Sequence, residues 1–298
     1  MPDQIVFRPF YTNMKQFRIL LLPFSIIYGG IVAIRNLLYN IGLLPAKNFK
    51  IPVISVGNLT VGGTGKSPQI EYLIRLLRDK FPVATLSGGY GRKTSGFLYA
   101  TENSASTDIG DEPRQYKRKF PSVPVCVDVN RVQGIKKLQL DHTELRAVLL
   151  DDAFQYRAIK PGISILLTEY NKLYIHDHVL PAGSLREYKH GARRADIIVI
   201  TKCPSILSPI EKRCLTRDIN PLPYQQVYFS KIVYGELMPM IKQHVPLLTP
   251  STHVFLLTGI ANAAPLLNYL QEKTKNITHI AYSDYQFCEE APSGSTSS

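Results

Sequence analysis

Residues 57–68 read Gly-Asn-Leu-Thr-Val-Gly-Gly-Thr-Gly-Lys-Ser-Pro. The stretch before them, Ile51-Pro-Val-Ile-Ser-Val56, is short, β-branched and apolar, which predicts a buried parallel strand. The stretch after them, residues 69–80, is predicted to be a helix with one apolar face made by Ile70, Leu73, Ile74 and Leu77. A glycine-rich loop between a strand and a helix presents free backbone amides and the positive helix end to an anion. The sequence therefore predicts a phosphate-binding loop.

The loop also carries the side chains that a nucleoside triphosphate needs. Lys66 would reach the β- and γ-phosphates, and the Ser67 hydroxyl would bind a magnesium ion. Thr60 stands where the Walker A pattern has its first glycine, so an ordinary glycine-rich turn is the alternative. Gly-Lys-Ser at the helix start favours ATP and Mg²⁺ as ligands. The predicted nucleotide-binding residues are Gly62, Gly63, Thr64, Gly65, Lys66 and Ser67.

Composition is that of a globular protein with a polyanionic partner. Of 298 residues, 45% are apolar and 19% charged, which argues against disorder. The net charge of +12 fits either nucleic acid or an anionic membrane surface. We find no nucleic-acid recognition motif and expect no nucleic-acid partner. The four cysteines include no Cys-x-x-Cys pair, which predicts reduced thiols in a cytosolic protein.

An apolar run near the N-terminus favours the membrane as that partner. Residues 19–34 are uncharged and mostly apolar, between Lys15 and Arg18 on one side and Arg35 on the other. The run is shorter than the roughly 20 residues of a spanning helix, and Pro23 and Gly29-Gly30 are expected to interrupt it. A signal peptide conflicts with a nucleotide site so close behind, whereas a helix packed on the core stays open. We favour a monotopic anchor in the cytoplasmic leaflet with basic flanks at the lipid headgroups.

Strands alternate with helices along most of the chain. This pattern predicts an α/β fold: a P-loop NTPase-like, doubly wound, mostly parallel sheet with its site at the carboxyl ends of the strands. A change of pattern near Pro221-Leu-Pro223 predicts a second, smaller α/β domain. The expected boundaries are an apolar membrane-contacting segment at 1–45, a kinase-like core at 46–225, a small C-terminal domain at 226–290 and a disordered tail at 291–298.

Two acidic motifs are candidates for the chemistry. Leu149-Leu-Asp-Asp152 has the form of a Walker B strand, whose carboxylates would reach the magnesium ion from the side opposite Ser67. Asp111-Glu112 follows Gly110 at a predicted helix start, where a plain helix cap is the alternative. In the functional interpretation one carboxylate accepts the proton of an attacking hydroxyl and its neighbour helps to hold magnesium. Arg186 lies in a turn-rich loop and could clamp an acidic substrate.

Taken together, these motifs resemble the tetraacyldisaccharide 4'-kinase family, whose members phosphorylate the lipid A precursor. The resemblance runs in order along nearly the whole chain. It rests on Val56-Gly-Asn-Leu-Thr-Val-Gly-Gly-Thr-Gly-Lys-Ser-Pro68, Gly89-Tyr-Gly-Arg92, Gly110-Asp-Glu-Pro113, Asp151-Asp-Ala-Phe-Gln155, Leu180-Pro-Ala-Gly-Ser-Leu-Arg-Glu187 and Arg194-Ala-Asp196.

The resemblance implies an ATP–magnesium-dependent kinase acting on an anionic acylated glucosamine disaccharide 1-phosphate. It would be a monomer on the cytoplasmic face of the bacterial inner membrane. Asp111 and Lys66 would be catalytic, and the metal would be held by Ser67, Glu112, Asp151 and Asp152. The implied substrate-binding residues are Asn58, Tyr90, Arg92, Arg131 and Arg186.

The chain departs from the family pattern at three positions. Gly88 replaces an arginine, and Tyr156 and Tyr285 replace histidines, the second of which partners the catalytic aspartate. The sequence also ends where members of the family continue. A relative that binds nucleotide and membrane but transfers little phosphate is therefore the main alternative. A membrane-partitioning ATPase ranks last, because its signature lysine position is Val61 here.

Overall fold

The structure is a computed structural model that describes residues 20–235, 237–238, 247–260 and 263–282. Its internal contacts divide the chain into two compact units, Met1–Ile232 and Val233–Ser298.

The large unit is built on one eight-stranded sheet. Its strand order is β3-β4-β2-β5-β1-β6-β7-β8, and every neighbouring pair is parallel except β3 with β4. The predicted α/β fold with a mostly parallel sheet is confirmed. The strands are β1 (Val53–Asn58), β2 (Val83–Ser87), β3 (Leu98–Tyr99), β4 (Val125–Val127), β5 (Ala147–Asp151), β6 (Ile163–Glu169), β7 (Ile197–Cys203) and β8 (Gln226–Lys231).

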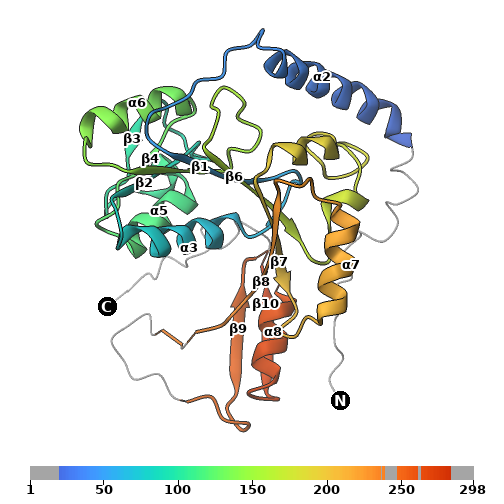
Figure 1. Cartoon of the computed structure of the whole chain (residues 1–298). Coiled ribbons are helices and arrows are strands. Elements are labelled where there is room, and N and C mark those ends of the chain that lie inside the picture. Colours follow the sequence, from blue (N-terminus) through green and yellow to red (C-terminus); the bar gives the residue numbers. More distant parts are fainter. Residues whose placement is uncertain (1–19, 236, 239–246, 261–262, 283–298) are drawn as a thin grey trace. The chain divides into compact units, whose positions relative to one another are not determined.

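Helices cover both faces of this sheet, as Figure 1 shows. The helices α3 (Lys66–Arg78) and α5 (Asp111–Lys119) bury apolar side chains against one face, and α6 (Arg131–Asp141) covers the other. The short α4 (Ser106–Ile109) precedes α5, and α7 (Pro209–Ile219) joins β7 to β8. Two 3₁₀ turns, η2 (Tyr174–His176) and η3 (Lys189–Arg194), lie between β6 and β7.

The strand order places a site at the carboxyl end of β1. This strand lies between β5 and β6, so the chain leaves it toward one side for β2 and returns on the other side at β6. Ligands bind at such a reversal point in doubly wound sheets, outside the carboxyl ends of the strands. The glycine-rich loop follows β1, and the acidic pair ends β5, directly beside it.

The boundary predicted at residue 225 is wrong by one strand. Strand β8 pairs in parallel with β7 and therefore belongs to the large sheet, which the chain leaves after Ile232. Pro221 and Pro223 mark only the connection from α7 to β8. The residues of β8 are exposed or half-buried, as expected for an edge strand of the large sheet.

The N-terminal apolar run forms one uninterrupted helix, α2 (Leu22–Asn40), and the expected break at Gly29-Gly30 is wrong. Pro23 lies in the first turn, where a missing N–H costs nothing. Gly29 is needed at its position because a Cβ there would lie 2.6 Å from the Tyr188 ring. Of the helices in the described residues, α2 alone has the length and the mean hydropathy, 1.4, to cross a membrane.

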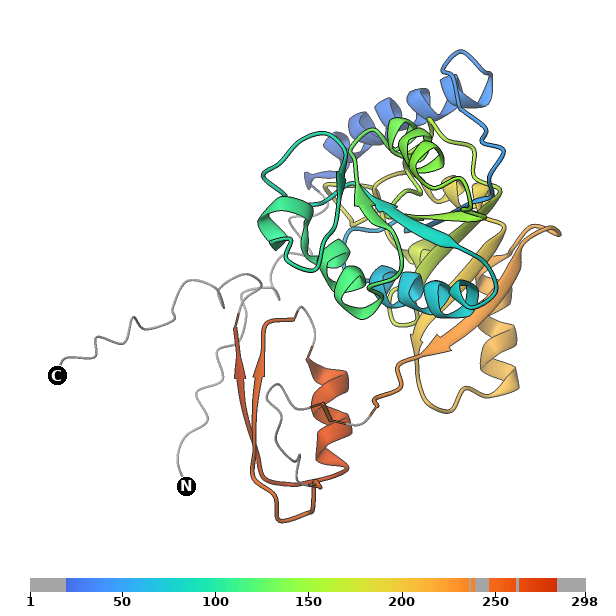
Figure 2. The same cartoon turned by 90° about the vertical axis from the view of Figure 1, so that its left-hand side faces the viewer.

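The smaller unit is a β-α-β arrangement. Strands β9 (Val254–Thr258) and β10 (Ile277–Ala281) run parallel, and α8 (Ala264–Gln271) connects them along one side, as Figure 2 shows. His279 on β10 shares a hydrogen bond of 2.8 Å with Thr258 on β9. The departure noted at Tyr285 lies outside the described residues.

Candidate active site

Hydrogen bonds among its own residues and to β7 fix the conformation of the phosphate loop. Gly65 caps α3 with a φ of +89°, a left-handed conformation that a Cβ would disfavour. The Asn58 amide donates to Thr64 Oγ1 at 2.9 Å, and Thr201 Oγ1 donates to the Thr64 carbonyl at 2.8 Å. Lys66 Nζ in turn donates to Asn58 Oδ1 at 3.4 Å. Asn58, predicted to contact substrate, is thus also a brace for the loop.

Two cations converge on Asp152 beside the loop. Lys66 Nζ lies 3.7 Å from Asp152 Oδ2, and Arg186 Nη1 lies 3.0 Å from Oδ1. Asp152 itself has a φ of +47°, a left-handed conformation that is uncommon for residues other than glycine. The structure therefore brings together Lys66, Asp152 and Arg186 as predicted from separate motifs.

Asp151 is the buried member of the acidic pair. Burial raises its pKa to about 6; the Tyr116 hydrogen bond and Lys66 oppose this, whereas the carboxylates Asp152 and Glu112 add to it. Tyr116 Oη donates to Asp151 Oδ2 at 2.8 Å. Burial raises the pKa of Tyr116 and the Asp151 charge adds to the rise, while Ser67 opposes it. Asp151 Oδ1 is buried and has no hydrogen-bond partner among the described residues. A buried carboxylate oxygen left without a hydrogen-bond partner is a position for a cation.

These residues fit a magnesium ion bound jointly with a nucleotide. No group of three or more His, Cys, Asp or Glu side chains in the described part of the chain forms a metal cage. Magnesium in kinase-type sites does not need one, because it takes one or two carboxylates and completes its shell with water and substrate phosphates. Asp151 and Ser67 supply ligands of that kind, and Asp152 and Glu112 add negative charge beside them.

Asp111 and Glu112 open α5, but neither is its cap. Gly110 occupies the N-cap with a φ of +90°, and a Cβ there would lie 3.1 Å from the Tyr90 carbonyl oxygen. Neither side chain makes a capping hydrogen bond, although both lie in the first turn of α5, where the helix dipole favours negative charge. The Asp111 side chain is exposed, and no hydrogen bond or ion pair engages it in the described residues. The negative charge of Glu112 adds to the rise in the pKa of Asp151, so Glu112 lies within electrostatic reach of that carboxylate.

The segment that carries Arg186 is fastened to the phosphate loop. Val61 N–H donates to the Ser184 carbonyl at 2.8 Å, and Arg186 N–H donates to the Leu59 carbonyl at 2.7 Å. Gln155 adds a side-chain bond of 2.7 Å to the Asn58 carbonyl. A movement of this segment would therefore shift the backbone of the phosphate loop.

Two departures from the family pattern meet at Arg131. The guanidinium lies 5.0 Å from the centre of the Tyr156 ring, and a Cβ on Gly88 would come within 2.6 Å of Arg131 Nη2. Burial lowers the pKa of Arg131, while Tyr156, Asp152, Asp151 and Asp128 oppose the shift. Arg131 therefore faces the acidic site, with Gly88 leaving it room and Tyr156 stacking on it.

Two predicted substrate residues make no hydrogen bond to the phosphate loop in the described part of the chain. Tyr90 is 84% exposed, and Arg92 Nη2 donates to the Gly96 carbonyl at 2.7 Å. Both remain predictions. Conversely, Tyr116 was missed, although its spacing of four residues from Glu112 places both on one face of α5.

Comparisons with known proteins agree with this geometry. The model of the tetraacyldisaccharide-1-P 4'-kinase family (LpxK) matches residues 17–294. The tetraacyldisaccharide 4'-kinase of Parabacteroides distasonis is 47% identical over 277 residues, which cover 91% of this chain and 75% of that protein. The enzyme of the same name from Flavobacterium johnsoniae is 45% identical over 279 residues, covering 93% of this chain and 82% of the relative.

A solved structure shares the fold. The crystal structure of LpxK from Aquifex aeolicus in complex with ATP has a TM-score of 0.73 and 30% sequence identity, and the match covers 94% of this chain and 86% of that chain. The ordered motifs, the sheet with its phosphate loop, and these relatives point to one ancestry. The chain belongs to the tetraacyldisaccharide 4'-kinase family.

Proposed function

We propose that this chain transfers the γ-phosphate of ATP to the 4'-hydroxyl of a tetraacyl glucosamine disaccharide 1-phosphate, a step of lipid A biosynthesis. Membership of the family makes the chain an ATP-dependent kinase, and its relatives carry this name. These relatives offer no support for the alternative of a binding-only relative, one that binds nucleotide and membrane but transfers little phosphate. The observation that carries the proposal is the convergence of Lys66, Asp152 and Arg186 beside a phosphate loop with a buried acidic partner.

The residues divide the work of phosphoryl transfer. Asp111 accepts the proton of the sugar hydroxyl, whose oxygen attacks the γ-phosphorus as the bond to the β-phosphate oxygen breaks and ADP leaves. Lys66 and the loop amides hold the phosphates in line for that attack. Ser67, Asp151, Asp152 and Glu112 would hold magnesium, which neutralises charge on the phosphates when bound. Arg186 and Arg131 would bind the negative groups of the substrate.

The test is transfer of labelled γ-phosphate from ATP to the tetraacyl disaccharide 1-phosphate in micelles of neutral detergent. We expect labelled product with the disaccharide and none without it. ATP binding without transfer would instead favour the binding-only relative, whereas ATP hydrolysis that ignores the disaccharide would favour an ATPase.

Tyr116→Phe is expected to weaken use of magnesium more than it lowers maximal turnover. The substitution removes the hydroxyl that donates to Asp151, and a lost supporting contact of this kind costs about tenfold in metal affinity. The measurement is the Mg²⁺ concentration for half-maximal transfer. Tyr99→Phe is the matched control, because Tyr99 Oη also donates to an aspartate, Asp141, at 2.8 Å but outside this cluster. Equal Mg²⁺ dependence in the two variants would refute the role given to Tyr116.

We also propose that the chain is a monomer attached by α2 to the cytoplasmic face of the inner membrane. The helix buries only Ser25 and Gly29. Its polar side chains face the rest of the large unit. Ser25 Oγ accepts from the Ala182 N–H at 2.9 Å, and Asn36 donates to Glu187 at 2.8 Å. The exposed apolar side chains of the helix include Leu22, Phe24, Ile26, Ile27, Ile31, Ile34 and Leu37. Such a helix suits the lipid interface.

Replacing Ile27 and Ile31 by Glu is expected to release most of the protein from membranes. Both side chains are more than 60% exposed, so the fold tolerates the change, while each charge opposes insertion into lipid. The measurement is the fraction that sediments with anionic vesicles. Ile206→Glu with Ile210→Glu is the control, because these residues are also exposed but lie outside α2. Undiminished sedimentation of the α2 variant would contradict the anchor.

A further inference from the structure

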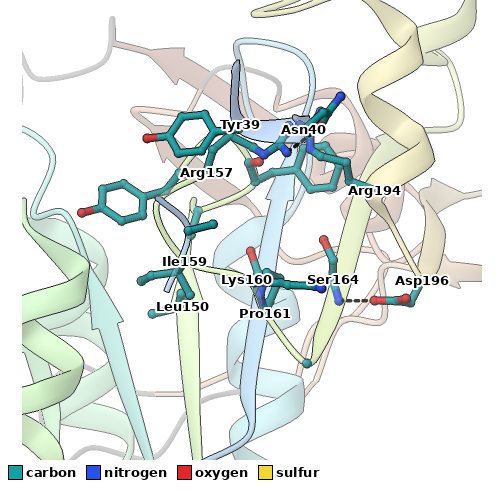
Figure 3. Close-up of a pocket in the computed structure, with 16 residues that line it drawn as sticks. Tyr39, Asn40, Leu150, Arg157, Ile159, Lys160, Pro161, Ser164, Arg194 and Asp196 are labelled. Atoms are coloured by element: carbon teal, nitrogen blue, oxygen red, sulfur yellow. Dashed lines mark hydrogen bonds between the residues drawn. The ribbon is translucent and has the colours of Figure 1, made fainter. Parts of the chain in front are cut away.

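A cavity of about 590 Å³ lies between the C-terminal end of α2 and the middle of the large sheet, as Figure 3 shows. Its lining includes Ser55 on β1 and Ser164 on β6, which are partners in the parallel register of these strands. They face away from Ile54 and Val56, whose side chains join the core on the α3 side. No residue of the phosphate loop and neither acidic pair lines the cavity, so it is separate from the phosphoryl-transfer site.

Two buried polar groups of the lining lack partners. Ser55 is 3% exposed, and its hydroxyl makes no hydrogen bond within the described residues. Arg157 Nη1 is also buried and makes no hydrogen bond within the described residues. Buried polar groups in native proteins are nearly always satisfied, so each unsatisfied one calls for a partner. The guanidinium N–H can only donate and the serine hydroxyl can also donate, so an acceptor in the cavity would satisfy either of them.

The surroundings of Arg157 carry excess positive charge. Arg157 Nη2 donates to Asn40 Oδ1 at 2.8 Å, but no carboxylate of the described chain pairs with Arg157. Its guanidinium lies 5.5 Å from the centre of the Tyr39 ring, and that of Arg35 lies 5.6 Å from the same centre. Burial, followed by the nearby Arg194, lowers the pKa of Arg157, with Glu187 opposing and Arg35 adding to the shift.

The remaining charges at the cavity leave this excess in place. Arg194 is paired with Glu187 at 2.7 Å, and Lys160 at the rim is exposed. Asp196 is the only carboxylate among the lining residues, and it accepts a hydrogen bond of 2.7 Å from the Ser164 N–H. An anion in the cavity would thus meet one unpaired arginine, a free hydroxyl and a rim lysine.

We propose that this cavity binds the phosphate group of an anionic membrane lipid. Arginine binds phosphate with paired, charge-assisted hydrogen bonds, and basic pockets beside membrane helices on the cytoplasmic side bind lipid headgroups. The lining residues Tyr39 and Asn40 belong to the last turn of α2, so a headgroup seated there would lie at the C-terminal end of the helix that we propose contacts the membrane. The inference that this phosphate belongs to a lipid rests on the proposed attachment of α2 to the membrane.

The test uses the full chain and dihexanoyl phosphatidylglycerol below its micelle concentration, with binding measured by equilibrium dialysis. Dihexanoyl phosphatidylcholine and inorganic phosphate serve as comparison ligands. We expect phosphatidylglycerol to bind best, and Arg157→Gln to weaken it about tenfold, as for a lost hydrogen bond to a charged group. Ser55→Ala should weaken it less while leaving the fold intact. Arg213→Gln, which removes an exposed arginine on α7, should have no effect.

Several outcomes would overturn the inference. If Arg157→Gln binds the lipid as well as Arg213→Gln does, Arg157 does not bind the headgroup and only holds α2 in place. If inorganic phosphate binds as well as phosphatidylglycerol, the site serves a soluble anion. If Arg157→Gln instead raises the KM for the disaccharide in neutral detergent, the phosphate belongs to the substrate. A wild-type chain that binds the short-chain lipid but not vesicles would refute the membrane position of α2 and support the site.

Discussion

Asp111→Asn is expected to lower kcat by about 10²–10⁴-fold, because the amide cannot accept the proton of the sugar hydroxyl. ATP affinity and thermal stability should change little, since the Asp111 side chain is exposed and makes no contact within the described residues that folding would lose. The measurement is single-turnover transfer of labelled phosphate at saturating ATP, with nucleotide binding followed separately. A lowered kcat with unchanged nucleotide binding is the signature of a group used only in the chemical step.

Asp108→Asn is the matched control for this variant. Asp108 is an exposed aspartate three residues earlier, on α4, so its replacement makes the same chemical change and should leave transfer unaltered. Near-normal turnover of Asp111→Asn would exclude Asp111 as the base.

Lys66→Ala should lower kcat by about 10²–10³-fold, the usual cost of removing one preorganised donor to developing charge. ATP affinity should fall as well, because this cation would contact the phosphates already in the ground state. The substitution also releases Asp152, whose remaining cation is Arg186 at 3.0 Å. Turnover and ATP binding should therefore be measured together with the melting temperature.

The comparison for Lys66→Ala is Lys80→Ala, which removes an exposed lysine just beyond the other end of α3. A fall in turnover that matches a fall in melting temperature would indicate a damaged loop. A stable variant with full transfer would refute the role of Lys66 outright.

Local patterns were enough to predict the sheet and the phosphate loop. The apolar strand before Gly57 and the helical spacing after Lys66 fix both elements, because each depends on neighbouring residues alone. Asp151 beside the loop was also predictable, since the carboxyl ends of adjacent parallel strands meet at one edge. The fold was therefore the part of the structure that the sequence predicted most completely.

Long-range side-chain contacts were not accessible in this way. That Tyr116 donates to Asp151, or that Gly88 and Tyr156 both lie against Arg131, depends on three-dimensional packing between separate motifs. The boundary at Pro221 failed for a related reason, because an edge strand and the first strand of a new domain can show the same sequence pattern. Likewise, glycines inside α2 were compatible with a helix because Gly29 contacts Tyr188 there.

The inner face of α2 has a practical consequence for any experiment on the proposed membrane attachment. Glu187 is almost fully buried, and its carboxylate accepts hydrogen bonds from Asn36 of α2, from Gln155 and from Arg194. Deleting α2 would uncover this carboxylate and remove the hydrogen bond from Tyr28 to the Arg186 carbonyl. Polar substitutions confined to the outward side chains of the helix would keep both contacts, so they change the surface of α2 without disturbing the residues beneath it.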